Sequence, residues 1–154
     1  MKKILFLVIS LCIFLPLFSE TEQLTDFSEL ITALKQGEIV RVVVDYGQCQ
    51  LISGNEEKDA PQATGGMTID VFEYFAPHTL GNQRAFLVFS HSSLINYGGF
   101  IYNYVKFKIY DDDSVKITAQ YVSTTDFEIE MDENFFSKIN NGKDQGAVYF
   151  YRIK

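Results

Sequence analysis

Apolar residues recur at helical spacing early in the chain and at every second position for most of the remainder. Asp26, with Glu29 three residues later, is typical of a helix N-cap, and Gly37 is typical of a helix end. Between them, the spacing i, i+3, i+4 and i+7 of one helix face is occupied by Phe27, Leu30, Ile31 and Leu34. The pattern therefore predicts one amphipathic helix near the start of the domain.

After Gly37 the period of the pattern falls to two, which is typical of strands with one buried face. The runs that predict strands are residues 39–46, 67–75, 85–89, 101–110, 115–121, 127–131 and 148–153. The polar stretch 53–66 is expected to be an exposed loop, and the continuous apolar run Ala85–Phe89 a central strand covered on both sides. The acidic segment Asp111–Ser114 favours a hairpin between the strands that flank it.

No helical pattern separates these runs, so consecutive strands are expected to pair in antiparallel fashion. The sequence predicts an α+β fold that is predominantly antiparallel β. About seven strands would form a meander curled into an open barrel or half-barrel, with the N-terminal amphipathic helix closing one end or packing on one face. A sandwich of two sheets is the alternative.

The first residues have the layout of a cleavable secretory signal peptide. Lys2 and Lys3 form a basic start, residues 4–15 form an apolar run, and Ser19 is a small residue at the expected cleavage point. The run ends at Pro16 and is shorter than the roughly 18–20 residues that span a bilayer. The expected division is a signal peptide at 1–19, a polar leader at 20–26 and a single β-rich domain at 27–154.

The net charge limits the class of partner. Acidic residues outnumber basic ones by 20 to 13, and cleavage after Ser19 would change the net charge from −7 to −9, because only Lys2 and Lys3 are lost. This sign disfavours nucleic-acid and phosphate binding. The interpretation favoured for the acidity is solubility of a small exported domain, with an acidic docking surface as the alternative.

Cysteine usage leaves one candidate thiol. Cys12 lies in the predicted signal peptide, so Cys49 is the single thiol of the expected mature chain. A reactive thiol needs a base or a positive neighbour, and His91 is the available base because His78 lies in a turn after proline. The sequence favours Cys49 as a small buried hydrophobe, with a reactive thiol as the alternative.

Ser90 and His91 form a candidate polar cluster at the end of an apolar strand, where they could line the mouth of a pocket. A hydrolase needs a serine on a sharp turn, and no glycine-flanked serine elbow is present in the sequence. A histidine that bonds backbone is therefore favoured. The three adjacent acids Asp111–Asp113 favour a solvated turn over a calcium site, and the sequence predicts no metal and no cofactor.

Tyrosines supply the remaining functional signal. Tyr102, Tyr104 and Tyr110 share one face of a predicted strand with Lys106 and Lys108. Such a face is a candidate surface for a protein, glycan or lipid partner, since aromatic rings bury a large area at little entropic cost. Ordinary packing across strands under the helix is the alternative.

The chain resembles the VirK family of exported bacterial proteins. The stretches that carry the resemblance are the signal peptide, Phe27–Gly37, Val40–Cys49, Gly65–Gly66, Phe86–His91 and Tyr104–Ile109. The resemblance implies export and an association with virulence, and it brings no catalytic residues. It also implies a second cysteine near the C-terminus that would pair with Cys49, but Phe135–Asn140 contains none.

Taken together, these features predict a periplasmic or secreted binding or interaction domain that is not an enzyme. Its partner would be a protein, glycan or lipid, and it would meet the membrane only through its transient signal peptide. Two alternatives remain open. One is a secreted effector or a component of an envelope or secretion machine, joined through open strand edges. The other is a small hydrolase-like enzyme that uses His91 with Ser90 or with an acid such as Asp70.

Overall fold

The structure, a computed structural model, describes residues 21–143 and 146–154. The predicted signal peptide lies outside these residues. The elements of the described part are β1 Thr21–Leu24, α1 Phe27–Lys35, β2 Ile39–Asp45, a 3-10 turn Tyr46–Gln48, β3 Gln50–Ser53, β4 Glu56–Lys58, β5 Thr64–Thr68, β6 Glu73–Phe75, β7 Phe86–Asn96, β8 Phe100–Tyr110, β9 Ser114–Ser123, β10 Ile129–Lys138 and β11 Val148–Ile153. No helix among them has the length and hydropathy needed to span a membrane.

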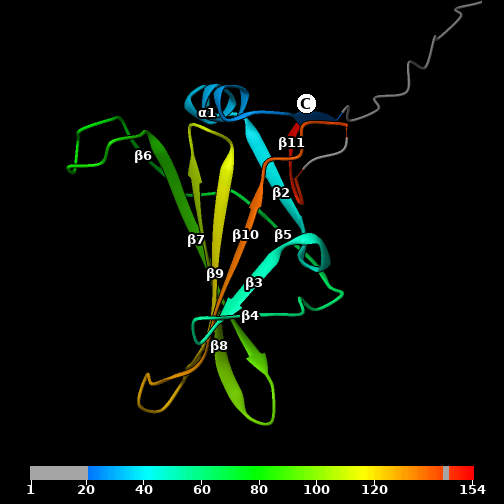
Figure 1. Cartoon of the computed structure of the whole chain (residues 1–154), viewed down its shortest axis with the longest axis vertical. Coiled ribbons are helices and arrows are strands. Elements are labelled where there is room, and N and C mark those ends of the chain that lie inside the picture. Colours follow the sequence, from blue (N-terminus) through cyan, green and yellow to red (C-terminus); the bar gives the residue numbers. More distant parts are fainter. Residues whose placement is uncertain (1–20, 144–145) are drawn as a thin grey trace, which may run out of the picture.

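The strands form two sheets, with every pairing between strands antiparallel. The smaller sheet has the order β1-β11-β2-β5, and the larger has the order β4-β3-β10-β9-β8-β7-β6. Figure 1 shows α1 across one end of the molecule and the β7–β8 and β9–β10 hairpins at the opposite end. The α+β class, the antiparallel pairing and the amphipathic helix are confirmed. The sheets do not close into a barrel within the described residues.

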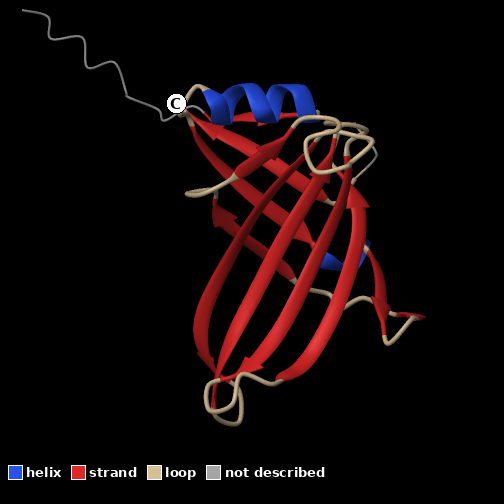
Figure 2. Cartoon of the chain, turned by 90° about the vertical axis from the view of Figure 1, so that its left-hand side faces the viewer, coloured by secondary structure: helices blue, strands red, loops and turns tan. Residues whose placement is uncertain are grey.

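Helix α1 begins and ends where the sequence predicts. The carboxylate of Asp26 accepts from the Glu29 amide at 2.8 Å, and the Glu29 carboxylate accepts from the Thr25 amide at 2.7 Å. The first bond satisfies an amide that the first helical turn leaves without a partner, and the second resembles a capping box but is made to the residue before the N-cap. Gly37 ends the helix at a φ of 77°. Figure 2 shows α1 lying over the end of both sheets, and its buried side chains are Phe27, Leu30, Ala33 and Leu34.

The hydrophobic core lies between the two sheets, directly below α1. The smaller sheet contributes Val40, Val42, Val44, Val148 and Phe150. The larger sheet contributes Leu87, Phe89, Phe107, Ile109, Val115, Ile117 and Phe135 from its inner face, the face toward the smaller sheet. Burying each such side chain stabilises the fold by about 1.5–3 kcal/mol. Figure 2 shows the long strands of the larger sheet continuing well past the smaller sheet.

Three local predictions are wrong. The segment 20–26 is not a leader before the domain, because residues 21–24 form β1 and pair with β11. The run 67–75 is not one strand, because the chain leaves the smaller sheet after Thr68 and enters the larger sheet at Glu73. The stretch 53–66 is not a simple loop, because it contains β4 and the start of β5. In each case pairing with a distant strand decides the structure, and local periodicity does not show it.

Candidate functional site

Strand β7 has neighbours on both sides only over its first three residues. β8 pairs with β7 along the whole length from Phe86 to Asn96, whereas β6 pairs only with Phe86–Val88. No strand in the described part of the chain pairs with the β6 side of residues Phe89–Asn96. We call this stretch the open edge. The apolar run Ala85–Phe89, predicted as a covered central strand, is buried apart from Val88. It begins a longer strand, and the later part of that strand has no neighbour on one side.

The ends of the β7–β8 ladder show which backbone groups face the open edge. The Asp111 amide donates to the Ala85 carbonyl at 3.2 Å, and the Tyr97 amide donates to the Gly99 carbonyl at 2.8 Å. In antiparallel sheets alternate residues bond to opposite neighbours, so the odd-numbered residues of β7 bond to β8. The N–H and C=O groups that face the open edge are those of Ser90, Ser92, Leu94 and Asn96, the last of which adjoins the hairpin turn.

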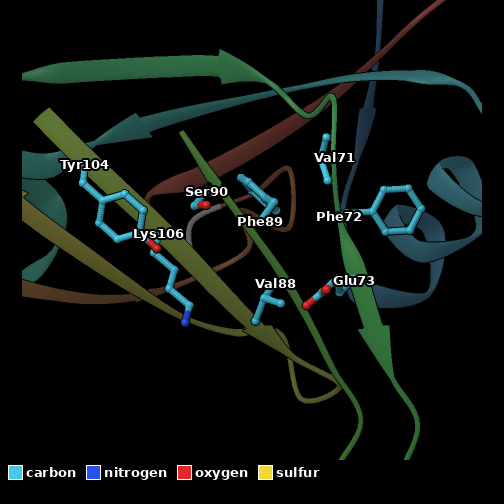
Figure 3. Close-up of a pocket in the computed structure, with 8 residues that line it drawn as sticks. All are labelled: Val71, Phe72, Glu73, Val88, Phe89, Ser90, Tyr104 and Lys106. Carbon is cyan, nitrogen blue, oxygen red and sulfur yellow. The ribbon is translucent and has the colours of Figure 1, made fainter. Parts of the chain in front are cut away.

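A pocket of about 310 Å³ lies on the outer face of the larger sheet, where β6 ends and the open edge begins. We call it the outer pocket. Figure 3 shows β7 passing between the Val71–Glu73 segment on one side and two side chains of β8 on the other. The pocket is lined by Val71, Glu73, Val88, Ser90, Tyr104 and Lys106, among others. It thus combines apolar walls with one acidic and one basic group.

A second pocket, of about 510 Å³, lies on the other side of the open edge, between β5 and the inner face of β7 and β8. We call it the inner pocket. Its polar lining includes Tyr46, Thr68, Asp70, His91, Ser93 and Asn103. The open edge therefore has a pocket on each face of the sheet.

Two glycines of β5 allow the close packing that forms one wall of the inner pocket. A Cβ atom on Gly65 would lie 2.9 Å from the Tyr46 ring, and one on Gly66 would lie 2.7 Å from the Val42 carbonyl oxygen. The Tyr46 ring packs edge-on against Phe135 at 4.9 Å. Burial, and to a lesser extent the nearby Cys49, raises the pKa of Tyr46, so this wall carries a neutral hydroxyl. The glycine pair was visible in the sequence, but its partner Tyr46 was not.

Ser90 and His91, predicted as one polar cluster at a strand end, lie within β7 and are separated. Adjacent residues of a strand point to opposite faces, so Ser90 lines the outer pocket and His91 the inner one. The residues that share the inner pocket with His91 are Ser93 and Asp70. Within residues 21–143 and 146–154, no side-chain hydrogen bond joins His91 to either of them.

The three candidate tyrosines lie on the outer face of β8, which neither α1 nor the smaller sheet covers. Tyr104 lines the outer pocket. Tyr110 lies under the guanidinium of Arg84, with 4.6 Å between the guanidinium carbon and the ring centroid. Tyr102 stands beside Leu94 near the far hairpins. The tyrosines are spread along the strand, and of the three only Tyr104 lines the outer or the inner pocket.

Cys49 is buried, with 7% of its surface exposed, as the sequence favoured. Its thiol donates to the Asp45 carbonyl at 3.5 Å. Burial is the main cause that raises the pKa of Cys49 to about 11; a hydrogen bond with Ser137 acts in the opposite direction. A thiol with so high a pKa is protonated at neutral pH and is a poor nucleophile.

The acidic turn between β8 and β9 uses its carboxylates in structural contacts. Asp111 accepts from the Ala85 amide at 3.0 Å, and Asp113 accepts from the Phe27 amide at 2.8 Å. Asp112 pairs with Arg84 and bonds to Ser114. The three carboxylates point to different partners, so this turn joins the larger sheet to α1.

Comparisons with known proteins agree with this fold. The model of the VirK protein family matches residues 23–127, which is more than half of the chain. No curated protein matches. The crystal structure of a VirK family protein from Legionella pneumophila superposes with a TM-score of 0.64 at 12% identity, covering 83% of this chain and 97% of that one. At this identity the likeness shows the fold alone, but together with the family match it leads to one conclusion: the chain belongs to the VirK family.

Proposed function

We propose that this protein is an exported, non-enzymatic interaction domain that binds an extended segment of a partner protein as an added strand on the open edge of β7. The observation that carries the proposal is an edge of eight residues with a pocket on each face. The expectation of export rests on the signal-peptide layout of residues 1–19.

The open edge lacks the features that protect the other edges. Proteins shield edge strands with charged residues, proline, short length or bulges. β4 consists of Glu56, Glu57 and Lys58, β6 and β1 are only three and four residues long, and β5 contains two glycines. In contrast, Phe89–Asn96 has no Asp, Glu, Lys, Arg, Pro or Gly. An edge left in this state is suited to pairing with another strand.

The pockets give an added strand a means of recognition. Peptides that extend a sheet gain affinity from main-chain hydrogen bonds and specificity from pockets that receive alternate side chains. A segment that continues in the place of β6 would meet the backbone groups of Ser90, Ser92 and Leu94. Its side chains would point alternately to the outer pocket, beside Tyr104 and Lys106, and to the inner pocket, beside His91 and Ser93.

A pair of substitutions at Ser92 tests the proposal. The probe is a peptide selected from a displayed library of random 12-residue sequences on the mature protein. Ser92→Pro removes an N–H that faces the open edge and places a ring there, without removing a bond to β8. We expect it to weaken binding about tenfold or more, because a hydrogen bond is lost and the ring obstructs pairing. Ser92→Ala keeps the amide and should bind within about twofold of the wild type.

The thermal unfolding midpoint of both variants serves as the control, and both should stay close to the wild type. Equal binding by the proline variant would overturn the proposal, as would selected peptides that bind away from β7. Light scattering tests whether the occupant is instead a second copy of the chain. A concentration-dependent dimer that Ser92→Pro abolishes would replace the partner segment with self-association.

A further inference from the structure

Three lysines gather on the outer face of the larger sheet, and one of them, Lys106, also lines the outer pocket beside the open edge. Lys106 and Lys108 are two residues apart on β8, so they point to the same face. Lys116 on β9 is directly opposite Lys108 in the register. We call these three residues the lysine cluster.

This arrangement is electrostatically unfavourable on its own. Like charges directly opposite each other on neighbouring strands destabilise a sheet. Among the described residues, none of the three lysines forms an ion pair within 4.0 Å. In the register, the acid nearest to Lys108 on its own row is Glu73, two strands away. The cluster is thus a group of three lysines without close ion pairs on a chain with a net charge of −7, and Glu73 is the acid that shares the outer pocket with Lys106.

Aromatic rings lie beneath the ammonium groups of two of these lysines. The Lys108 ammonium lies 4.1 Å from the centroid of the Phe86 ring and 5.1 Å from that of Tyr110. The Lys116 ammonium lies 5.7 Å from the centroid of Phe136, a side chain that is 37% exposed. These rings support the ammonium groups through cation–π attraction, but they bring no negative charge.

Neutral polar groups continue the lysine cluster across the sheet. Ser90, Lys106, Thr118 and Asn134 form one row over four neighbouring strands. The Thr118 hydroxyl and the Asn134 side-chain oxygen are 3.0 Å apart, which leaves the amide nitrogen of Asn134 available to an external acceptor. With strands about 4.8 Å apart, the row is about 14 Å long.

We infer that the lysine cluster and its neighbouring row bind an acidic polysaccharide. Carboxylates repeated along such a polymer would pair with the lysines, hydroxyls would bond to Thr118 and Asn134, and sugar rings would pack on the exposed part of Phe136. A face with cations, aromatic rings and neutral hydrogen-bonding groups offers a contact for each of these chemical groups of the ligand. The inference does not require strand addition at the open edge, because it uses side chains on the outer face of β7 to β10 and none of the backbone groups of β7, although Ser90 and Lys106 also line the outer pocket.

The test uses polygalacturonate as the probe and neutral dextran as the control polymer. The double variant Lys108→Gln and Lys116→Gln removes the opposed pair. The matched control, Lys58→Gln with Lys143→Gln, changes the net charge equally at positions on β4 and in the loop before β11. Titration calorimetry at low salt should show binding by the wild type, about tenfold weaker binding by the cluster variant, and less than about twofold loss by the control.

Thermal unfolding provides a second readout. Because the opposed lysines repel each other, the cluster variant should unfold at the same temperature as the wild type or higher. A lower unfolding temperature would show that the lysines are structural and would overturn the inference. Absence of polygalacturonate binding, equal loss in both double variants, or binding only to phosphatidylglycerol vesicles would also overturn it.

Discussion

The two halves of the larger sheet have the same strands but different surroundings. In the half next to α1, the inner face is closed by the smaller sheet, and Phe107 is 1% exposed. In the far half, beyond the smaller sheet, Phe100 lies at the other end of the same strand, on its outer face, and is 65% exposed. The large side chains exposed there are Leu94, Tyr97, Phe100, Tyr102, Phe127 and Ile129. We call these the packed half and the distal half.

The two halves differ in their roles: the packed half stabilises the fold, and the distal half carries most of the edge where we propose that a partner binds. The packed half contains the core and the helix contacts, so it accounts for most of the apolar burial. The distal half contains most of the open edge, and its outer face carries exposed apolar residues around two hairpins. Exposed apolar residues gathered at one end of a domain are typical of a contact surface, which supports the proposed function. The strand order therefore leaves the open edge, where we propose that a partner binds, next to a well-packed region.

The largest expected effect is on core packing. Phe107→Ala should lower the free energy of unfolding by about 3–5 kcal/mol, because it leaves a cavity between the sheets. Phe100→Ala, the same change in the distal half of β8, should alter it by no more than about 0.5 kcal/mol. Urea denaturation of both variants measures the difference. Similar losses of unfolding free energy in the two variants would contradict the difference in packing between the two halves.

The second prediction compares the chemical reactivity of one buried side chain, Cys49, with that of one exposed side chain, His91. Cys49, buried, should react with a thiol reagent only on unfolding, whereas the exposed His91 should be modified by diethylpyrocarbonate in the native protein. Rapid labelling of Cys49 in the native protein would contradict its burial in the core.

The same thiol predicts a dependence of stability on alkaline pH. The folded pKa of Cys49, about 11, is above its ordinary value of 9.0. Its contribution is therefore complete below pH 9 and is lost as the pH rises toward 11. Cys49→Ala should remove this part of the loss, and unfolding free energies at pH 8 and pH 10.5 measure it. An unchanged difference between the two pH values in the variant would contradict the assignment.

A smaller effect is expected at the start of α1. Asp26→Ala removes the side-chain acceptor for the Glu29 amide and should cost about 1 kcal/mol. Asp26→Asn retains an acceptor and should restore most of the stability. Chemical denaturation of the two variants tests the cap, and equal loss in both would show that charge alone matters.

The smallest effect has the opposite sign and lies in the distal half. Phe127 is 68% exposed and has a φ of 62°, a backbone conformation that is costly for an aromatic residue. Phe127→Gly should therefore raise the free energy of unfolding by up to about 1 kcal/mol. A loss of stability would mean that the Phe127 ring makes contacts that outweigh its backbone strain.

Local pattern was sufficient for part of this structure. The spacing of Phe27, Leu30 and Leu34 predicted α1, and the cap at Asp26 placed its start correctly. Alternation predicted the long strands β8 and β9 and the hairpin between them. These features depend on neighbouring residues, which is why a single sequence shows them.

Long-range pairing could not be predicted in the same way. β2 pairs with β11, about a hundred residues later in the chain, and this pairing draws the smaller sheet away from β7. The open edge is a consequence of that topology. Residue type pointed to Ser90, His91 and Tyr104. The sequence could not show that Ser90 and Tyr104 line the outer pocket whereas His91 lines the inner pocket together with Tyr46.

The most direct test of the account is amide hydrogen exchange along β7, measured by NMR with and without a saturating selected peptide. We predict that the amides of Ser90, Ser92 and Leu94 exchange quickly in the free protein and become protected together in the complex. The amides of His91 and Ser93, which bond to β8, should be slow in both states. Protection elsewhere, with these three amides unchanged, would contradict strand addition at the open edge.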